Sequence, residues 1–214
     1  MNTINKNVSV AFKAMIFLAS ITMAKAQTTY TWARSVESFS GGPGTGSGNN
    51  WNDPHKILGI PDASGVDETD YDGFLSLGVN GSIILSFGAG FQSEGTSAPD
   101  LFCWEYGGTA ESYTVSVSSD GINFHVAGSL SGTVSSGGWA SGGGYQTIDL
   151  DAVSLTGVYN YVKIDDNNNL STSLPFKGAD IDAVAVPESA IVPEPSSALL
   201  VGFGVLSFLF RRRY

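Results

Sequence analysis

Short β-rich runs separated by turn residues constrain the fold of this 214-residue chain more than any other feature. From residue 30 onward, no segment keeps the 3.6-residue apolar period of an amphipathic helix over three turns. Apolar and polar residues alternate instead, in runs bounded by Gly, Asn, Asp and Ser. The runs include ARSVESF, GSIILSF, DLFCWEY, SYTVSVS, NFHVAGSL, YQTIDL, YNYVKID and DIDAVAV. About eight strands in roughly 160 residues predict an all-β fold, an antiparallel two-sheet sandwich of the jelly-roll type.

Two local patterns make this prediction specific. In SYTVSVS, Tyr113, Val115 and Val117 fall on one face of a strand, and Ser and Thr fall on the other. Asn80-Gly81 and Asp120-Gly121 lie between β-rich runs, and both pairs favour the positive φ angles of tight hairpin turns. A strand of a β-sandwich needs one face buried between the sheets and one face exposed to solvent.

The first 26 residues have the parts of a secretory signal peptide. Lys6 and Lys13 supply early positive charge, AMIFLASITMA is apolar, and Ala24 and Ala26 are the small residues that signal peptidase reads. The apolar segment is shorter than the about 20 residues that a membrane-spanning helix needs. We therefore predict that signal peptidase removes residues 1–26 and that Gln27 begins the mature protein. An N-terminal core helix is the alternative.

The exported part is strongly acidic. Residues 27–192 contain four Lys or Arg and nineteen Asp or Glu, which gives a net charge of −15. Because nucleic-acid binding rests on Lys and Arg contacts with phosphates, this charge argues against a nucleic-acid partner. The acidic side chains can attract cations, or they can simply keep an exported protein soluble. Cys103, the only cysteine, alternates with apolar neighbours and is expected to be a small buried residue.

The C-terminal residues combine three features in order. Pro193, Glu194 and Pro195 precede the apolar residues 198–210, and the arginines Arg211, Arg212 and Arg213 follow. Thirteen residues make a helix about 20 Å long, which is short against the roughly 30 Å hydrocarbon core of a bilayer. Such a helix can pause in the inner membrane with its arginines on the cytoplasmic side. It would be a poor permanent anchor.

This order resembles the PEP-CTERM sorting signal of exported proteins, which occurs mainly in Gram-negative bacteria that make extracellular polysaccharide. The resemblance implies that an exosortase, a membrane-embedded cysteine transpeptidase, recognises the Pro-Glu-Pro region and removes the tail. We predict a signal peptide at 1–26, a β-sandwich surface domain at 27–188 and a sorting signal at 189–214 that contacts the membrane transiently. A simple short C-terminal anchor is the alternative.

The body of the chain also resembles a known module. ILGIPD, FLSLGVNGSIILSF, PDLFCWEY, YTVSVSSDGINF, YVKIDD and GADIDAV follow, in order, a β-sandwich of PEP-CTERM and other bacterial cell-surface proteins. That module is similar to galactose-binding-like and discoidin-like jelly rolls. The resemblance covers residues 33–186. It implies a protein of the cell surface or the biofilm matrix, with no established catalysis.

Acidic residues are the best candidates for a site. Asp180 and Asp182 lie two apart on a predicted strand, so both carboxylates are expected on one side, with Ile181 and Ala183 on the other. Like charges on one face are costly unless a cation or hydrogen-bond donors compensate them. No cofactor is required, but calcium, which takes six to eight oxygen ligands, is possible. The alternative is that the carboxylates cap turns. The predicted calcium ligands are Asp62, Asp100, Glu105, Asp180 and Asp182.

The run DETDYDG is a second acidic cluster. Glu68, Asp70 and Asp72 fall at positions 1, 3 and 5 of an EF-hand loop. Position 12 is Val79, where a bidentate glutamate belongs, and no helices are predicted on either side. We therefore reject an EF-hand, and a loose surface calcium site stays open.

Two tryptophans lie at glycine-rich stretches. Trp51 follows GGPGTGSGNN, and Trp139 lies within SSGGWASGGG. Neither stretch has the Gly-Lys-Ser/Thr of a phosphate-binding loop, so nucleotide binding is not expected. A loop tryptophan can stack on a sugar ring, or it can fold back as a lid over the core.

The sequence thus favours a non-catalytic, exported protein that binds polysaccharide or another surface component. A hydrolase or lyase of matrix sugars is the alternative, because glycoside hydrolysis uses two carboxylates about 5–10 Å apart. The chain lacks a zinc-type histidine cluster, a Gly-x-Ser-x-Gly elbow and a cofactor fingerprint. A structural matrix component without a ligand is the third possibility.

Overall fold

The structure is a computed structural model that describes residues 28–45, 50–63, 72–106, 111–132, 144–168 and 177–193. Within these ranges the secondary structure consists of strands and short 3-10 helices. The predicted signal peptide, the predicted sorting helix and Trp139 lie outside the described residues. The 3-10 helices are η1 (Asn50–Asn52), η2 (Pro54–Ile57), η3 (Asp151–Val153) and η4 (Glu188–Ala190).

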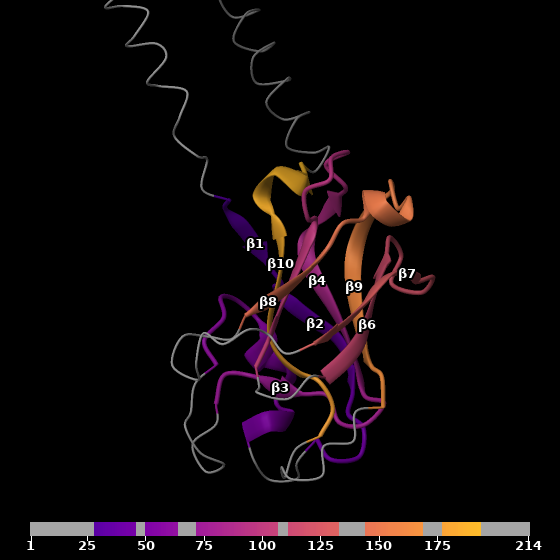
Figure 1. The fold of residues 1–214 in the computed structure, drawn as a ribbon. Helices are drawn as coiled ribbons and strands as arrows, with labels where there is room; N and C mark the ends of the chain where they lie inside the picture. Colours follow the sequence, from indigo (N-terminus) through magenta and orange to yellow (C-terminus); the bar gives the residue numbers. More distant parts are fainter. Residues whose placement is uncertain are drawn as a thin grey trace, which may run out of the picture.

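The strands form two antiparallel sheets, each with strands drawn from distant parts of the sequence (Figure 1). Sheet A has the order β1-β10-β5-β8, and β3 also pairs with β10. Its strands are β1 (Tyr30–Trp32), β3 (Leu75–Ser76), β5 (Leu101–Glu105), β8 (Tyr145–Ile148) and β10 (Asp180–Pro187). Sheet B has the order β11-β4-β9-β6-β7, and β2 also pairs with β4. Its strands are β2 (Ser35–Ser40), β4 (Ser82–Gln92), β6 (Glu111–Ser118), β7 (His125–Gly132), β9 (Val158–Asp166) and β11 (Ile191–Val192). The prediction of an all-β, antiparallel two-sheet sandwich of the jelly-roll type is confirmed.

Alternating apolar residues of both sheets form one core between the sheets. Tyr113, Val115 and Val117 are fully buried there, as the alternation in SYTVSVS predicts. Sheet A contributes Cys103, and burial raises the pKa of its thiol to about 12. Each large apolar side chain buried in this way stabilises the fold by about 1.5–3 kcal/mol. The core holds the two sheets, and therefore the side chains on their outer faces, in fixed positions.

Strand β10 is buried along its whole length and carries a bulge near its start. The register with β5 shifts between Ile181, which pairs with Glu105, and Ala183, which pairs with Trp104. Because a bulge adds one residue, the alternation resets at Asp182. Ile181 packs in the core between the sheets, whereas Ala183 packs on the outer face of sheet A. The prediction that Ile181 and Ala183 share a face is therefore wrong.

The described part of the chain enters and leaves at one end of the sandwich. Tyr30, at the start of β1, pairs with Pro187, at the end of β10 (Figure 1). We call this the terminal end, and the end where β10 begins the far end. No helix among the described residues is long and apolar enough to cross a membrane.

Candidate functional site

Five aromatic side chains meet on the outer face of sheet A, and we call this group the aromatic face. Neighbouring ring centroids lie 5.0–6.2 Å apart, mostly with tilted or edge-to-face rings. Such geometries are the favoured ones for aromatic pairs. The members are Tyr30 and Trp32 of β1, Phe102 and Trp104 of β5, and Tyr145 of β8.

Strand order explains how these rings meet. Strand β10 lies between β1 and β5 and presents only Ala183 and Ala185 to this face. Because these side chains are small, the rings of Tyr30 and Phe102 reach each other across β10, with centroids 5.0 Å apart. Tyr145 at the margin is 52% exposed, and Tyr30 is partly exposed. The aromatic face is therefore packed at its centre and open at its edge.

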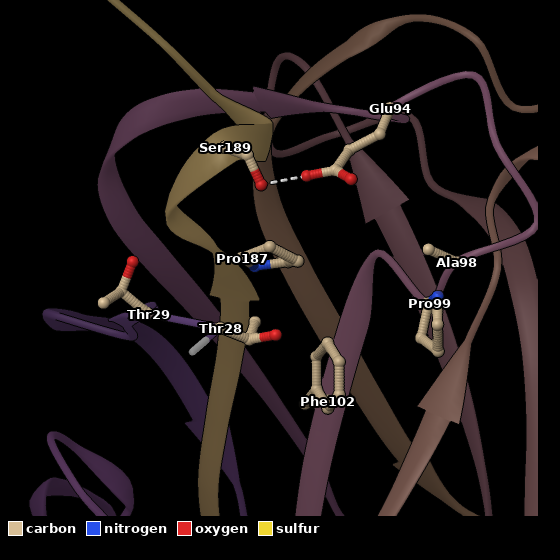
Figure 2. A pocket seen from close by; sticks show the side chains of 8 residues that line it. All are labelled: Thr28, Thr29, Glu94, Ala98, Pro99, Phe102, Pro187 and Ser189. Carbon is tan, nitrogen blue, oxygen red and sulfur yellow. Dashed lines mark hydrogen bonds between the residues drawn. The ribbon is translucent and has the colours of Figure 1, made fainter. Parts of the chain in front are cut away.

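A cavity of about 340 Å³ adjoins the aromatic face at the terminal end (Figure 2). Phe102 belongs to both. The hydroxyl of Ser189 donates a hydrogen bond to the carboxylate of Glu94, drawn as a dashed line in Figure 2. The cavity thus combines an aromatic wall, hydroxyl groups and one carboxylate. Its lining residues are Thr28, Thr29, Glu94, Ala98, Pro99, Phe102, Pro187 and Ser189.

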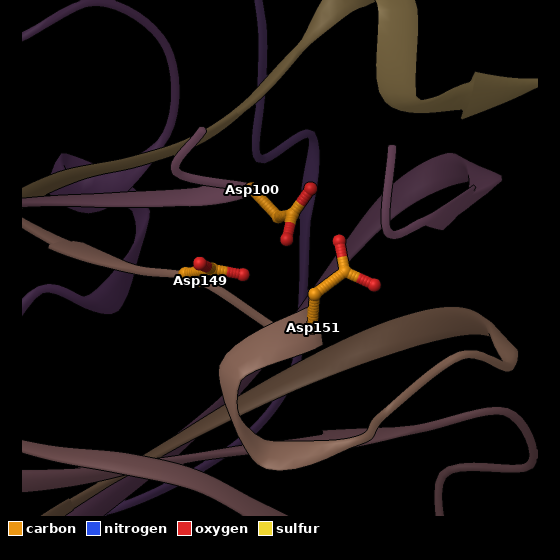
Figure 3. A group of neighbouring side chains, drawn as sticks. All are labelled: Asp100, Asp149 and Asp151. Atoms are coloured by element: carbon orange, nitrogen blue, oxygen red, sulfur yellow. The ribbon is translucent and has the colours of Figure 1, made fainter. Parts of the chain in front are cut away.

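Three aspartates cluster near the start of β5. Asp100, Asp149 and Asp151 each place a carboxylate oxygen within 4.8 Å of the other two (Figure 3). Asp100 is fully buried, and its two oxygens accept hydrogen bonds from the amides of Glu94 (3.1 Å) and Leu150 (2.8 Å). Burial raises the pKa of Asp100, and the two neighbouring aspartates add to the rise. These three carboxylates could hold a metal ion, but both oxygens of Asp100 already accept hydrogen bonds from backbone amides.

Four carboxylates gather at the far end of the sandwich. Glu105 ends β5 and Asp180 begins β10 in sheet A, while Glu111 begins β6 and Asp166 ends β9 in sheet B. All four are buried. One carboxylate oxygen of Glu111 accepts a hydrogen bond from the amide of Asp180 at 3.2 Å, which joins the two sheets. We call these residues the buried acid cluster.

Electrostatics within the buried acid cluster disfavours the charged forms. Burial, with repulsion from Glu111, raises the pKa of Glu105 to about 8. Burial raises the pKa of Glu111 to about 8 as well, and Asp166 contributes repulsion. Burial first, and then the neighbouring carboxylates, raise the pKa of Asp180 well above its usual range. A compensating positive charge nearby would lower the pKa values of Glu105, Glu111 and Asp180.

Asp182 lies apart from this cluster and caps a loop. Its carboxylate accepts hydrogen bonds from the amides of Asp62 (3.0 Å) and Ala63 (3.3 Å). Burial raises the pKa of Asp182 to about 6, although these amides oppose the rise. This is the capping role that the sequence left open beside calcium.

In the second acidic run, Asp72 forms an ion pair with Lys56, and Glu68 and Asp70 lie outside the described residues.

The five predicted calcium ligands therefore do not form one site. Asp100 directly precedes β5 at the terminal end, while Glu105 and Asp180 belong to the buried acid cluster at the far end. Asp62 and Asp182 meet in the separate cap described above. The prediction of a single constellation is wrong, because β5 places Asp100 and Glu105 at its opposite ends.

Trp51 is a core residue. It is 4% exposed and packs with Ala63, Phe74 and Tyr106. The rings of Phe74 and Tyr106 stack on each other, with their centroids 4.9 Å apart. A ring buried in this way has no face to offer a sugar. The structure matches the lid interpretation at Trp51, and the stacking interpretation is wrong there.

Sequence reasoning missed the aromatic face and half of the buried acid cluster. A partial signal was present, because Tyr30 and Trp32 alternate in YTW, and Phe102 and Trp104 alternate in LFCWE. Residues two apart on a strand share a face. No local pattern links Glu111 or Asp166 to Asp180.

Comparison with known protein families finds a match at the C-terminal end of the chain. The structure describes this end only as far as Pro193. The match covers residues 192–213, from just before the Pro-Glu-Pro triplet to the last arginine. This segment is a PEP-CTERM protein-sorting motif. The sequence-based prediction of that motif is confirmed. Most of the PEP-CTERM motif, including Glu194, Pro195 and Arg211 to Arg213, lies outside the described residues.

The remaining comparisons concern the whole chain. No curated protein sequence matches it. One similar solved structure is the C-terminal domain of a chitobiase from Bacteroides fragilis, with 11% identity, a TM-score of 0.46 and coverage of 76% of this chain and 96% of that chain. Another is the CBM32 of AlyQ in complex with 4,5-unsaturated mannuronic acid. Its identity is 13% and its TM-score is 0.42, and the match covers 75% of this chain and 98% of that chain. A third is CBM32-3 from a family 31 glycoside hydrolase from Clostridium perfringens. Its identity is 12% and its TM-score is 0.39, and the match covers 73% of this chain and 90% of that chain.

Proposed function

We propose that the chain is an exported, non-catalytic surface or matrix protein that binds polysaccharide through its aromatic face. Signal peptidase removes the N-terminal segment, and an exosortase processes the PEP-CTERM motif after a transient stay of the tail in the inner membrane. The observation that carries the proposal is the aromatic face itself, five rings on the outer side of sheet A beside a cavity that offers hydroxyl groups and one carboxylate.

The chemistry of the aromatic face suits a sugar. A pyranose ring has apolar C–H faces and a rim of hydroxyl groups. The rings of Trp32 and Tyr145 offer apolar surface with a polar tip, as is usual for amphipathic recognition surfaces. In the adjoining cavity, Glu94 and Ser189 offer an acceptor and a hydroxyl for the sugar rim. A few polar groups beside an apolar surface is the usual composition of a small-molecule site.

Charge narrows the class of polysaccharide. The exported part has a net charge of −15, and the charged group among the described lining residues of the cavity is Glu94. A polyuronate would meet like charge here, and unscreened like charge disfavours association. The expected ligand is therefore a neutral or amino-sugar polysaccharide.

The same cavity argues against glycoside hydrolysis. That reaction uses two carboxylates on opposite sides of the scissile bond. The described cavity lining supplies Glu94 alone, and Asp100 uses both oxygens to cap amides. We expect no reducing sugar to be released when the protein is incubated with the host polysaccharide. Release that depends on Glu94 would replace the binding proposal with the enzyme alternative.

Substitution of Trp32 or Tyr145 by alanine should weaken binding to the host's extracellular polysaccharide at least tenfold. The reason is that an aromatic side chain at the centre of a contact contributes about 1.4 kcal/mol or more. Affinity electrophoresis in gels containing the polysaccharide measures the effect. Tyr161→Ala is the matched control, because Tyr161 is partly exposed on β9 of the other sheet. Equal retardation of all variants, or none of the wild type, would contradict the proposal.

A further inference from the structure

We infer that Glu94 makes the site selective for a polysaccharide with free, protonated amines, that is, an amino-sugar polymer that is not fully N-acetylated. In this arrangement the aromatic face binds the sugar rings. The Glu94 carboxylate, in the adjoining cavity, accepts a hydrogen bond from an ammonium group. The inference rests on the proposed function, and it narrows the ligand from neutral or amino-sugar polysaccharides to cationic ones.

The carboxylate of Glu94 is exposed and has no positive partner among the described residues. The hydroxyl of Ser189 donates a hydrogen bond to its Oε1 atom, so Oε2 can accept one from a ligand. Figure 2 shows Glu94 and Ser189 on one side of the cavity and Phe102 on the other. An ammonium group has three donors and a full positive charge, and it therefore suits such an acceptor.

The loop that carries Glu94 is held in a defined conformation. The Asp100 carboxylate accepts a hydrogen bond from the amide of Glu94 at 3.1 Å. The next residue, Gly95, has a positive φ of 71°, and its amide donates to the hydroxyl of Ser93 at 3.0 Å. Because these contacts exist without a ligand, an amine would meet an acceptor that is already positioned, which lowers the ordering cost of binding.

Further acids lie near Glu94 at the terminal end. Asp100 binds the Glu94 amide and belongs to the group of three aspartates, and Glu188 directly precedes Ser189. These neighbouring acids are Asp100, Asp149, Asp151 and Glu188. A recess lined by one sign of charge raises the local concentration of ligands of the opposite sign. The cavity is thus placed to attract a polycation.

The lysines and the arginine of the described chain lie away from the cavity. Lys56 in η2, which contacts β3, and Lys177, just before β10, lie at the far end. Lys163 is in the half of β9 nearer the far end, where its ammonium pairs with Asp165 at 2.7 Å. The amide of Arg34 bonds to the middle of β4. None of these charges would repel an ammonium group at Glu94.

This chemistry discriminates between amino sugars. N-acetylation turns the amine into a neutral amide, and a hydrogen bond between charged groups is roughly twice as strong as one between neutral groups. A uronic acid would place a second carboxylate beside Glu94. The rings add to the preference for an amine, because a cation within about 6 Å of a ring centroid is attracted to the ring face. Phe102 lines the cavity and belongs to the aromatic face.

The test is affinity electrophoresis of the full-length protein in gels that contain the host's extracellular polysaccharide, either untreated or selectively N-acetylated with acetic anhydride. At about pH 6, where free amines are protonated, the untreated polymer should bind at least tenfold more tightly. Glu94→Gln should weaken binding to the untreated polymer about tenfold and leave binding to the N-acetylated polymer unchanged. Trp32→Ala should weaken binding to both, because ring contacts do not depend on the amine.

Glu188→Gln is the matched control, because it removes the same charge from an exposed residue next to Ser189. It should keep the preference for the untreated polymer. Equal, small effects of Glu94→Gln and Glu188→Gln would show that the amines meet only the net negative charge, and would overturn the inference. Equal binding of both polymers by the wild-type protein would also overturn it, while leaving the proposed function in place. No retardation in either gel would contradict the proposed function itself, and the inference with it.

Discussion

Replacing Asp100 by alanine should lower the free energy of unfolding by about 2–4 kcal/mol, because the buried amide of Leu150 and the partly buried amide of Glu94 lose their acceptor. Asp100 ties the amide of Glu94, in the loop after β4, to the amide of Leu150, in the loop after β8. Each orphaned amide costs about 1–3 kcal/mol, and relief of repulsion from Asp149 and Asp151 offsets part of that loss. Urea unfolding followed by tryptophan fluorescence measures the change.

Asp149→Ala is the matched control for this substitution. Asp149 belongs to the same group of aspartates, but it is only partly buried, and its one cap, to the amide of Ala152, is exposed. We expect this variant to lose less than about 1 kcal/mol. Equal losses for Asp100→Ala and Asp149→Ala would show that Asp100 does not hold the two loops together.

Replacement of the Pro-Glu-Pro triplet at 193–195 by three alanines should leave the C-terminal tail attached in the native host. In the wild-type protein, an exosortase is expected to recognise this triplet within the PEP-CTERM motif and remove the residues beyond it. Intact-mass measurement of protein from the host should show a shortened wild-type chain and a variant that ends at Tyr214. The expected effect on processing is nearly complete.

Glu188→Ala controls for changes near the cleavage region. Glu188 is exposed in η4, five residues before Pro193, and should not alter processing. Wild-type protein that keeps Tyr214 in the host would contradict exosortase processing and would support the short-anchor alternative.

The sandwich could be predicted because its strands carry their burial pattern locally. Tyr113, Val115 and Val117 alternate in the sequence and are all fully buried, since a strand places alternate side chains on one face. Turn chemistry was predictable only in part. Asn80 has a positive φ of 58°, yet β3 before it pairs with β10 and β4 after it pairs with β2 and β9. The turn is therefore present, and the predicted hairpin is wrong.

The sites depend on pairings that no local pattern encodes. Trp32 and Trp104, 72 positions apart in the sequence, meet because β10 separates their strands with small residues. Glu111 and Asp180 meet across the two sheets, 69 positions apart. The bulge at Asp182 also reverses the alternation of β10, so period-two reasoning from Asp180 onward gives the wrong face. Sequence reasoning found individual acids and aromatics but not the groups that they form.

The most direct test of polysaccharide binding is a titration of the protein with oligosaccharides from the host polysaccharide, followed through the tryptophan indole N–H signals in NMR spectra. Trp32 and Trp104 lie in the aromatic face, whereas Trp51 is buried in a separate cluster and serves as an internal control. Binding at the aromatic face predicts saturable shifts of the Trp32 and Trp104 signals with little change at Trp51. Unchanged Trp32 and Trp104 signals at saturating oligosaccharide would contradict it.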